Sequence, residues 1–340
     1  MNGLVDGEWR TDIGSGTNDA GEFVRRETVF RDRIGDARFQ PDAGRYHLYV
    51  SYACPWAHRT LLVRALKGLE DAISVDVVDP YRDDAGWRFT PSKDGCTPDT
   101  VNGRDYLREV YQLADDELSC RVTVPVLWDR REETIVNNES AEILRMLDTE
   151  MESHATRDVE LYPEGYRAAV DRIIEAIYDP INNGVYRAGF ATSQSAYDAA
   201  VDELFDALDH WDAVLGEQRY LAGDRLTEAD LCLFPTLIRF DHVYHTISKT
   251  LGSVDRGVPE PRTEDWRRIV DYDHLHAYLR DLYTTDSVAD TVRLDHIVEH
   301  YASPSSPRLA TRDVDEIDLG LNEPHDRDAM ASVEPTEAED

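Results

Sequence analysis

The pattern of apolar positions changes character near residue 155. Before it, short apolar runs of β-type composition alternate with helical stripes, which is typical of a mixed α/β domain. After it, apolar residues recur with the helical period only. The predicted strands cover 46–51, 73–78, 122–128 and 134–136, and the first helices cover 55–68, 106–113 and 139–148. Later helices are predicted over 163–179, 194–215, 227–245, 271–283 and 287–300.

This pattern divides the chain into four parts. Residues 1–44 are polar and glycine-bearing, and we expect an extended arm over the first domain. The α/β domain covers 45–155 and carries a long irregular insertion at 79–102. An all-helical domain follows over 156–303 and includes a polar stretch at 246–270. The last part, 304–340, is acidic and poor in large apolar residues, so we expect it to be disordered.

Pro125 lies inside the apolar run 122–128. A proline donates no ladder hydrogen bond, which argues against an ordinary central strand. A cis bond between Val124 and Pro125 at the entrance of the strand reconciles the two observations. We therefore expect a cis peptide there.

Acidic residues outnumber basic ones by 69 to 36, which gives a formal charge of −33. Such a surface repels polyanions, so we expect no nucleic-acid partner. The simplest explanation is adaptation to a salty cytosol, because the Debye length at molar salt is about 3 Å and self-repulsion is then screened. We expect the melting temperature to rise steeply with KCl.

No apolar run is long enough to span a bilayer, and the N-terminus shows no signal-peptide pattern. We therefore expect a cytoplasmic protein without a membrane partner. The four cysteines, Cys54, Cys96, Cys120 and Cys232, lack the spacing of a zinc site or a disulfide framework. We expect reduced thiols, no metal, and a core position for Cys232 within an apolar run.

Cys54 is the candidate nucleophile. A β-type run ends at this cysteine, Pro55 follows at once, and a helical pattern begins. The positive end of the helix dipole favours the thiolate, and helix-terminal cysteines have pKa values of about 3.5–7.5 instead of about 8.5. Ala57 stands where a resolving thiol would be, so this monothiol has to form a mixed disulfide with an outside thiol.

Five motifs follow one another along the chain: Cys54-Pro-Trp-Ala-His-Arg-Thr, Gly86-Trp87, Val122-Thr-Val-Pro-Val-Leu-Trp-Asp129, Asn138-Glu139-Ser140 and Arg239-Phe-Asp-His-Val-Tyr244. In these motifs, and over about Gly21 to Tyr301, the chain resembles the glutathionyl-hydroquinone reductases, the xi class of the glutathione transferase superfamily. The resemblance implies a thioredoxin-like N-terminal domain, an all-helical C-terminal domain and a homodimer.

The resemblance also implies a reaction and its residues. Cys54 attacks the sulfur of an S-glutathionyl-hydroquinone, the free hydroquinone leaves, and a second thiol regenerates the cysteine. Tyr186 is expected to give and take the proton, while Tyr244 and Tyr301 help to lower the pKa of Cys54. The thiol peptide, glutathione or γ-glutamylcysteine, is a co-substrate, and no cofactor is expected to be tightly bound. The expected thiol-binding residues are Trp87, Arg121, Val122, Thr123, Val124, Glu139 and Ser140.

Two physical features support this thiol site. The backbone of Val124 can pair with an extended peptide in strand fashion, because the proline after it interrupts regular pairing. Glu139 and Ser140 open a helix, so a carboxylate can bind the helix N-terminus while Glu139 holds an ammonium. Together they suit the γ-glutamyl head of either peptide. The alternative for Glu139 and Ser140, which we favour less, is that they only cap the helix.

Three other functions compete with this one. Cys54 also suits a general disulfide or dehydroascorbate reductase. A conjugating transferase is disfavoured, because that chemistry usually activates the thiol with a serine or tyrosine at this turn, and here Cys54 is the residue at the helix start. A non-catalytic binding module would not require the cysteine. Release of hydroquinone, and its loss on replacing Cys54, separates these functions.

Overall fold

The computed structural model describes residues 2–14, 16–245, 266–302 and 317–330. Two compact units make up the chain. The first unit comprises Met1–Gly16, Arg25–Val159 and Asp290–Ala310, and the second comprises Thr17–Val24, Glu160–Ala289 and Thr311–Asp340. Among the described residues, no helix has the length and apolarity needed to cross a bilayer.

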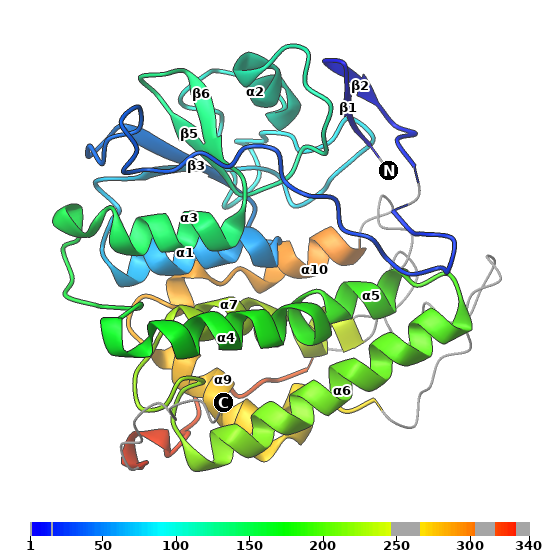
Figure 1. Ribbon diagram of the computed structural model, residues 1–340, viewed down its shortest axis with the longest axis vertical. Helices are drawn as coiled ribbons and strands as arrows, with labels where there is room; N and C mark the ends of the chain where they lie inside the picture. The colour runs from blue at the N-terminus through cyan, green and yellow to red at the C-terminus, as the bar shows by residue number, and fades with distance from the viewer. Residues whose placement is uncertain (1, 15, 246–265, 303–316, 331–340) are drawn as a thin grey trace. The chain divides into compact units, whose positions relative to one another are not determined.

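The first unit is built on a four-stranded sheet of order β4-β3-β5-β6. Strand β3 pairs in parallel with β4 and antiparallel with β5, which pairs antiparallel with β6. Helices α1 and α3 lie side by side along one side of the sheet, and α2 lies on the other side (Figure 1). The strands are β3 (Tyr46–Val50), β4 (Ser74–Val77), β5 (Val126–Asp129) and β6 (Thr134–Asn137), and the helices are α1 (Pro55–Leu66), α2 (Leu107–Ala114) and α3 (Ser140–Thr149).

The strand expected over 122–128 begins only at Val126. The Val124–Pro125 peptide is cis, as expected from the sequence. Residues 121–124 therefore run beside the sheet without joining its ladder, and Tyr111 donates a hydrogen bond to the carbonyl of Thr123 at 2.9 Å. The interruption leaves the backbone around Val124 outside the sheet's own pairing.

The N-terminal arm contains a hairpin that the hydrophobic pattern did not predict. Strands β1 (Gly3–Val5) and β2 (Glu8–Arg10) pair antiparallel across Asp6-Gly7, and both turn residues have positive φ angles, of 50° and 75°. Leu4 and Cys120 also exchange backbone hydrogen bonds of 2.8 and 3.0 Å. The strands are too short for a period-2 pattern, although the Asp-Gly pair is a hairpin signal. Residues 17–24 of the expected arm belong to the second unit.

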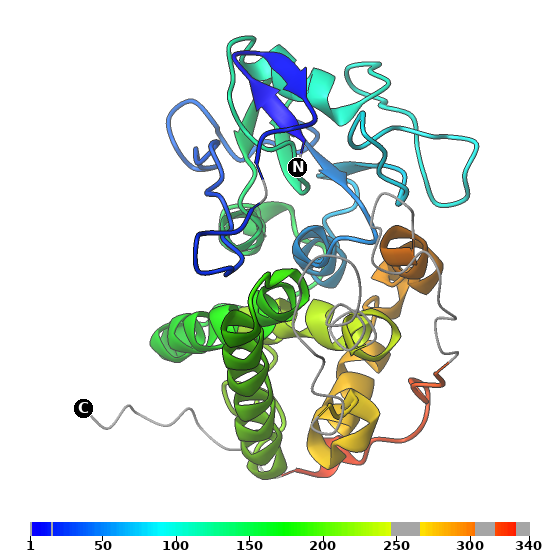
Figure 2. The ribbon, with the colours of Figure 1, turned by 90° about the vertical axis from the view of Figure 1, so that its right-hand side faces the viewer.

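The second unit is helical, as predicted. Figure 2 shows its helices after a turn of 90° about the vertical axis of Figure 1. The short helix α5 was not predicted, because its seven residues follow a π-helical turn that breaks the periodicity. Its helices are α4 (Arg167–Ile177), α5 (Gly184–Phe190), α6 (Gln194–Glu217), α7 (Glu228–Arg239) and α9 (Asp273–Thr284). Shorter turns are η1 (Glu152–His154), η2 (Glu164–Tyr166), η3 (Tyr178–Asn182), η4 (Phe240–Tyr244), η5 (Ile269–Asp271), η6 (Ala289–Thr291) and η7 (Arg327–Ala329), of which η3 and η4 are π-helical.

Helix α10 (Leu294–Ala302) belongs to the first unit, whereas we expected it in a helical domain over 156–303. Side chains explain its placement. His58 bonds the hydroxyl of Thr291 at 2.7 Å, and His300 bonds the carbonyl of Pro80 at 2.6 Å. These partners lie more than two hundred residues apart, so no local pattern could reveal them.

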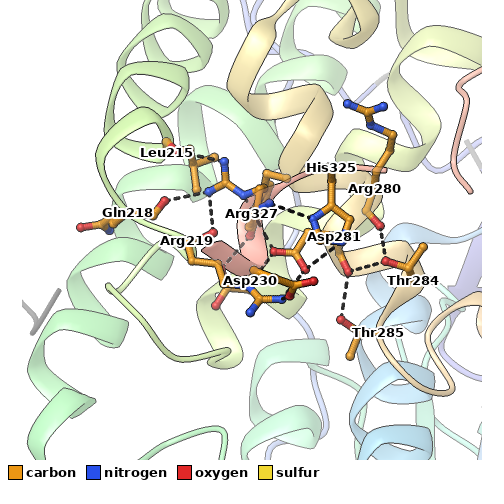
Figure 3. A network of polar contacts seen from close by, with 12 residues as sticks. Leu215, Gln218, Arg219, Asp230, Arg280, Asp281, Thr284, Thr285, His325 and Arg327 are labelled. Carbon is orange, nitrogen blue, oxygen red and sulfur yellow. Dashed lines mark hydrogen bonds and ion pairs between the residues drawn. The ribbon is translucent and has the colours of Figure 1, made fainter. Parts of the chain in front are cut away.

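Residues 317–330 differ from the disorder expected over 304–340. Arg327 is only 3% exposed, and its guanidinium donates to the carbonyls of Leu215, Gln218 and Arg219 at 2.6–3.0 Å (Figure 3). These carbonyls lie at the end of α6, where backbone acceptors lack helical partners. Beside them Asp281 forms a bidentate ion pair with Arg219 at 2.8 and 2.9 Å. The other residues of the expected tail, 304–316 and 331–340, lie outside the described part.

Candidate active site

Cys54 is the N-cap residue of α1, with an extended backbone (φ −81°, ψ 122°) and Pro55 at the first helical position. Its N–H donates to the carbonyl of Ser51 at 3.1 Å, and its own carbonyl accepts from His58 at 3.0 Å. Both bonds fix the turn between β3 and α1. The half-buried sulfur is thereby held at the start of the helix, as the sequence predicts.

The Sγ atom of Cys54 lies 3.5 Å from the carbonyl oxygen of Val124. This contact brings together the turn before α1 and the chain before the cis proline. A carbonyl oxygen can accept a hydrogen bond from the neutral thiol, but it has no hydrogen to donate to a thiolate. Ionisation of Cys54 therefore depends on the helix N-terminus and on other hydrogen-bond donors. A lowered pKa for Cys54 therefore remains a prediction.

Glu139 and Ser140 form the start of α3. Glu139 is the N-cap residue, and its carboxylate accepts from the backbone N–H of Ala141 at 3.5 Å. Ser140 is 2% exposed, and Arg59 donates to its hydroxyl at 3.4 Å. An amino-acid head group would find here an acid for its ammonium, and a hydroxyl with a guanidinium for its carboxylate. Arg59 belongs to the Cys54 motif, but its contact with Ser140 could not be predicted from the sequence, because the two residues meet only in the folded chain.

Trp87 lies in the insertion expected at 79–102 and is 6% exposed. Its ring stacks on His300 of α10, with centroids 5.2 Å apart and planes at 15°. On the same indole, the guanidinium carbon of Arg82 lies 5.6 Å from the ring centroid. Trp87 is thus held by His300 of α10 on one hand and by Arg82 of its own loop on the other. His300 and Arg82 were not singled out from the sequence.

Tyr301 follows His300 on α10, with ring centroids 5.0 Å apart, and belongs to the same unit as Cys54. We expected it in the helical domain together with Tyr186 and Tyr244. That grouping is wrong for Tyr301, because α10 packs on the first unit.

Tyr186 and Tyr244 form a pair in the second unit. Their hydroxyl oxygens are 3.2 Å apart, and their rings meet at 62°. Tyr186 lies on α5, directly after one π-helical turn, and Tyr244 ends the other. A hydroxyl that donates to its neighbour stabilises negative charge on that oxygen, which suits a group that exchanges protons.

Two phenylalanines extend this pair into an aromatic cluster. Phe190 stacks on Tyr186 at 6.1 Å and is 37% exposed, and Phe23 lies 5.1 Å from Phe190. Residues 20–21 hold Phe23 in place, because Gly21 accepts from the N–H of Thr192 at 2.8 Å. The cluster offers exposed aromatic surface beside a hydroxyl pair. Phe23 lies in the weakly patterned arm, which is why the sequence did not reveal it.

Comparison with known proteins gives a consistent result. Residues 53–150 match the family model for the glutathione S-transferase N-terminal domain, and residues 194–281 match that for the C-terminal domain. Glutathionyl-hydroquinone reductase PcpF of Sphingobium chlorophenolicum is 45% identical over 298 residues, covering 88% of this chain and 90% of that protein. Glutathionyl-hydroquinone reductase YqjG of Escherichia coli is 43% identical, covering 96% and 99%.

Solved structures agree. The xi-class glutathione transferase of Natrialba magadii is 57% identical, with a TM-score of 0.86, and the match covers 97% of this chain and 98% of that one. Glutathione-bound YqjG is 42% identical, with a TM-score of 0.83 and coverage of 97% and 99%. This chain belongs to the xi class of the glutathione S-transferase family. The family resemblance and the expected combination of a thioredoxin-like with a helical fold are confirmed.

Within this xi-class chain the predicted residues fall into two groups. The first unit contains Tyr301 and all the expected thiol-binding groups together with Cys54. The second unit contains Tyr186 and Tyr244. Cys54 contacts Val124 within the first unit, and Tyr186 contacts Tyr244 within the second.

The other cysteines of this xi-class chain have different surroundings. Burial raises the pKa of Cys96 and that of Cys120 to about 12, with nearby acids adding to the effect. Cys232 is buried within α7, as expected. Neutral thiols are poor nucleophiles, so Cys54, at its helix start, stays the candidate.

Proposed function

We propose that this protein reduces S-glutathionyl-hydroquinones to free hydroquinones, with Cys54 as the nucleophile and a small thiol as reductant. The two reductases named above support the activity by their names and their similarity over nearly the whole chain. The observation that carries the proposal is the position of Cys54. Its sulfur is at a helix N-terminus, next to a backbone segment left open by the cis proline.

The first step is binding of the conjugate through its thiol-peptide portion. Its γ-glutamyl ammonium pairs with Glu139, and the neighbouring carboxylate binds Ser140 and the N-terminus of α3. The peptide backbone pairs with Val124, after the manner of an added strand. Residues 121–123 continue that edge, and Trp87 covers the thiol portion. The sulfur is thereby brought to Cys54.

The chemistry is a pair of exchanges at sulfur. The Cys54 thiolate attacks the sulfur of the conjugate, a sulfur–sulfur bond forms, and the sulfur–carbon bond breaks. The electron pair of that bond stays on the aromatic carbon, which takes a proton and leaves as hydroquinone. A second thiolate attacks the mixed disulfide, which releases the oxidised thiol peptide and regenerates Cys54. Overall, the thioether sulfur of the conjugate and the sulfur of the second thiol are oxidised to a disulfide, and the two electrons reduce the aromatic carbon.

Tyrosines handle the proton in this proposal. Tyr186 donates it to the aromatic carbon, and its hydroxyl partner Tyr244 stabilises the charge that remains. Phe23 and Phe190 offer faces on which the aromatic half can stack. Tyr244 and Tyr301 also donate to the thiolate of Cys54 and so lower its pKa.

The wider setting follows from composition and family. The co-substrate is glutathione or γ-glutamylcysteine, no cofactor is tightly bound, and the protein acts as a cytoplasmic homodimer. The excess of acids supports work at high salt, where the charge is screened. A melting temperature that is the same in dilute buffer and in molar KCl would contradict this last point.

One observation favours a second candidate, a general disulfide or dehydroascorbate reductase. The groups proposed to bind the thiol peptide and Cys54 all lie in the first unit, without need of the tyrosine pair. That unit alone is therefore equipped for exchange with small mixed disulfides.

The deciding experiment uses the full chain in molar KCl. It is incubated with a glutathionyl-hydroquinone and excess thiol, and hydroquinone release is followed for the wild type, Cys54→Ala and Cys54→Ser. Release that is lost in both variants is the expected result. Activity on mixed disulfides alone would favour the second candidate, and no thiol chemistry with either substrate would indicate a non-catalytic module.

A further inference from the structure

The segment between β4 and α2 carries Trp87 without regular secondary structure of its own. Residues 78–106, all of which the structure describes, form neither a helix nor a strand. Connections of this length are uncommon in compact domains unless they serve a function. Trp87 is nevertheless only 6% exposed, and its indole is the group proposed to cover the thiol. Contacts with other elements therefore help to fix the position of this indole.

His300 of α10 makes two contacts with this segment. Its ring stacks on the indole of Trp87, with centroids 5.2 Å apart and planes at 15°. Its Nδ1 atom lies 2.6 Å from the carbonyl oxygen of Pro80. A carbonyl oxygen only accepts, so Nδ1 carries the proton and is the donor. This hydrogen bond fixes the rotation of the imidazole, and the stack passes that orientation on to the indole.

Helix α10 is itself fastened to the segment that it supports. His296 donates from Nε2 to the carbonyl of Asp94 at 2.8 Å, and Glu299 forms an ion pair with Lys93 at 2.5 Å. Positions three and four apart lie on one face of a helix, and His300 lies on the same face as these two. Because the other contacts keep α10 in place, a substitution at His300 removes only its hold on the indole.

Tyr301 is the second neighbour of His300 that has a proposed role at the thiol site. Its ring meets that of His300 edge-on, with centroids 5.0 Å apart and planes at 85°. His300 therefore has two routes to the site, through Trp87 and through Tyr301. The position of Tyr301 follows from the backbone of α10, whereas Trp87 lies in a segment without such a backbone. Trp87 is thus the neighbour that depends on His300.

We propose that His300 is a positioning residue of the thiol site, which holds the indole of Trp87 over the sulfur end of the bound peptide. The inference rests on the proposed function and adds a residue to it. An indole that is already in place loses no side-chain freedom when the peptide binds, which favours binding. Without His300 the indole has to be ordered at the moment of binding. The affinity for the thiol then falls, while the exchange at Cys54 proceeds as before.

The first experiment compares variants of the full chain at one fixed KCl concentration. Calorimetry measures the binding of reduced glutathione, and turnover of a glutathionyl-hydroquinone gives KM for the thiol and kcat. His300→Ala should weaken binding and raise KM about 10-fold, with kcat changed less than about twofold, as for the combined loss of a hydrogen bond and an aromatic pair. His300→Phe keeps a ring and His300→Asn keeps a donor, so each should lose only about threefold.

The deciding measurement is the coupling between His300 and Trp87. Trp87→Ala should weaken glutathione by itself, and adding His300→Ala should cause less than about a further twofold loss, because the indole that His300 holds is then absent. Effects that multiply in the double variant would overturn the inference, since His300 would then act without Trp87. A shift of the pH profile for alkylation of Cys54 by iodoacetamide in His300→Ala would also overturn it, because the effect would then belong to Tyr301.

His276→Ala is the matched control, because His276 of the second unit donates to the carbonyl of Leu319 at 2.8 Å, a hydrogen bond of the same kind. It should bind glutathione and turn over as the wild type does. Wild-type affinity in all three His300 variants, or in Trp87→Ala, overturns the inference while leaving the proposed reaction intact.

His300→Phe conserves the bulk of the side chain, so misfolding of His300→Ala does not remove the test. Absence of glutathione binding together with absence of hydroquinone release in the wild type would instead contradict the proposed function, and this inference with it.

Discussion

The two groups of proposed site residues are held in different ways. In the first unit, Cys54, Val124 and Glu139 owe their positions to backbone features: a helix start, a cis proline and an N-cap. In the second unit, Tyr186 and Tyr244 are placed by π-helical turns and by each other. The positions of the first group are determined by short local segments of sequence. The positions of the second group depend on packing between helices that are distant in the sequence.

The difference also concerns charge. The proposed thiol-binding residues of the first unit include charged groups, with Glu139 at the start of α3 and Arg59 donating to the hydroxyl of Ser140. The tyrosine side is aromatic and lies beside Phe23 and Phe190. One side therefore suits a charged peptide and the other an apolar ring. The following predictions separate the two sides.

Replacing the sulfur should have the largest effect. Cys54→Ser should lower hydroquinone release by more than about a thousandfold, because an alcohol at this position is a far weaker nucleophile. Cys96→Ser should leave release unchanged, since burial keeps that thiol neutral. Steady-state kinetics measures both. Comparable losses in the two variants would remove the distinction between these cysteines.

Arg327→Met should reduce the stability of the second unit without touching thiol chemistry. It leaves three carbonyls at the end of α6 without their donor and should cost about 3 kcal/mol of unfolding free energy. Denaturant unfolding and hydrogen exchange at the end of α6 report the loss. Arg225→Met, at an exposed position, should cost less than about 0.5 kcal/mol. Alkylation of Cys54 by iodoacetamide should proceed at the wild-type rate in both variants.

Tyr186→Phe tests the tyrosine side alone. Removing the proposed proton donor should lower kcat about 100-fold, within the range for general acid catalysis, while the affinity for glutathione stays the same. Tyr162→Phe is the control, because its hydroxyl bonds Asp171 away from the pair. Turnover that survives in Tyr186→Phe would take the proton-transfer role from this residue.

Ser140→Ala tests the thiol side and should have the smallest effect. Loss of one hydroxyl hydrogen bond should raise the KM for the thiol about fivefold with little change in kcat. Ser119→Ala, whose hydroxyl bonds the N-terminal turn at Asp6, should change neither constant. A fall in kcat with unchanged KM would place Ser140 in the chemical step instead.

Much of the first unit could be predicted from the sequence, because its features have local causes. The turn from Tyr46–Val50 into α1, the cis proline and the start of α3 each depend on a few neighbouring residues. The π-turns and α5 could not be predicted, since an extra residue per turn breaks the periodicity on which a helix is recognised. Contacts such as those of Arg59 with Ser140 and of His300 with Trp87 require the folded chain.

The C-terminal segment illustrates the same limit. Its composition favours disorder, but residues 317–330 find specific partners: Arg327 donates to carbonyls at the end of α6, and Leu319 is buried and bonded through its carbonyl to His276. Composition averages over many residues and cannot register one such partner. The N-terminal hairpin was missed for a different reason. Asp6-Gly7 is a local turn signal, but the weak hydrophobic pattern around it did not indicate strands.

The return of α10 to the first unit has a consequence for biosynthesis. The ribosome completes residues 25–159 long before it reaches Thr291 and His300, which contact His58, Pro80 and Trp87. Until then the nascent N-terminal half lacks the helix against which its tryptophan stacks. The first unit is therefore complete only after residues 290–302 have been synthesised and have packed on the segment made first.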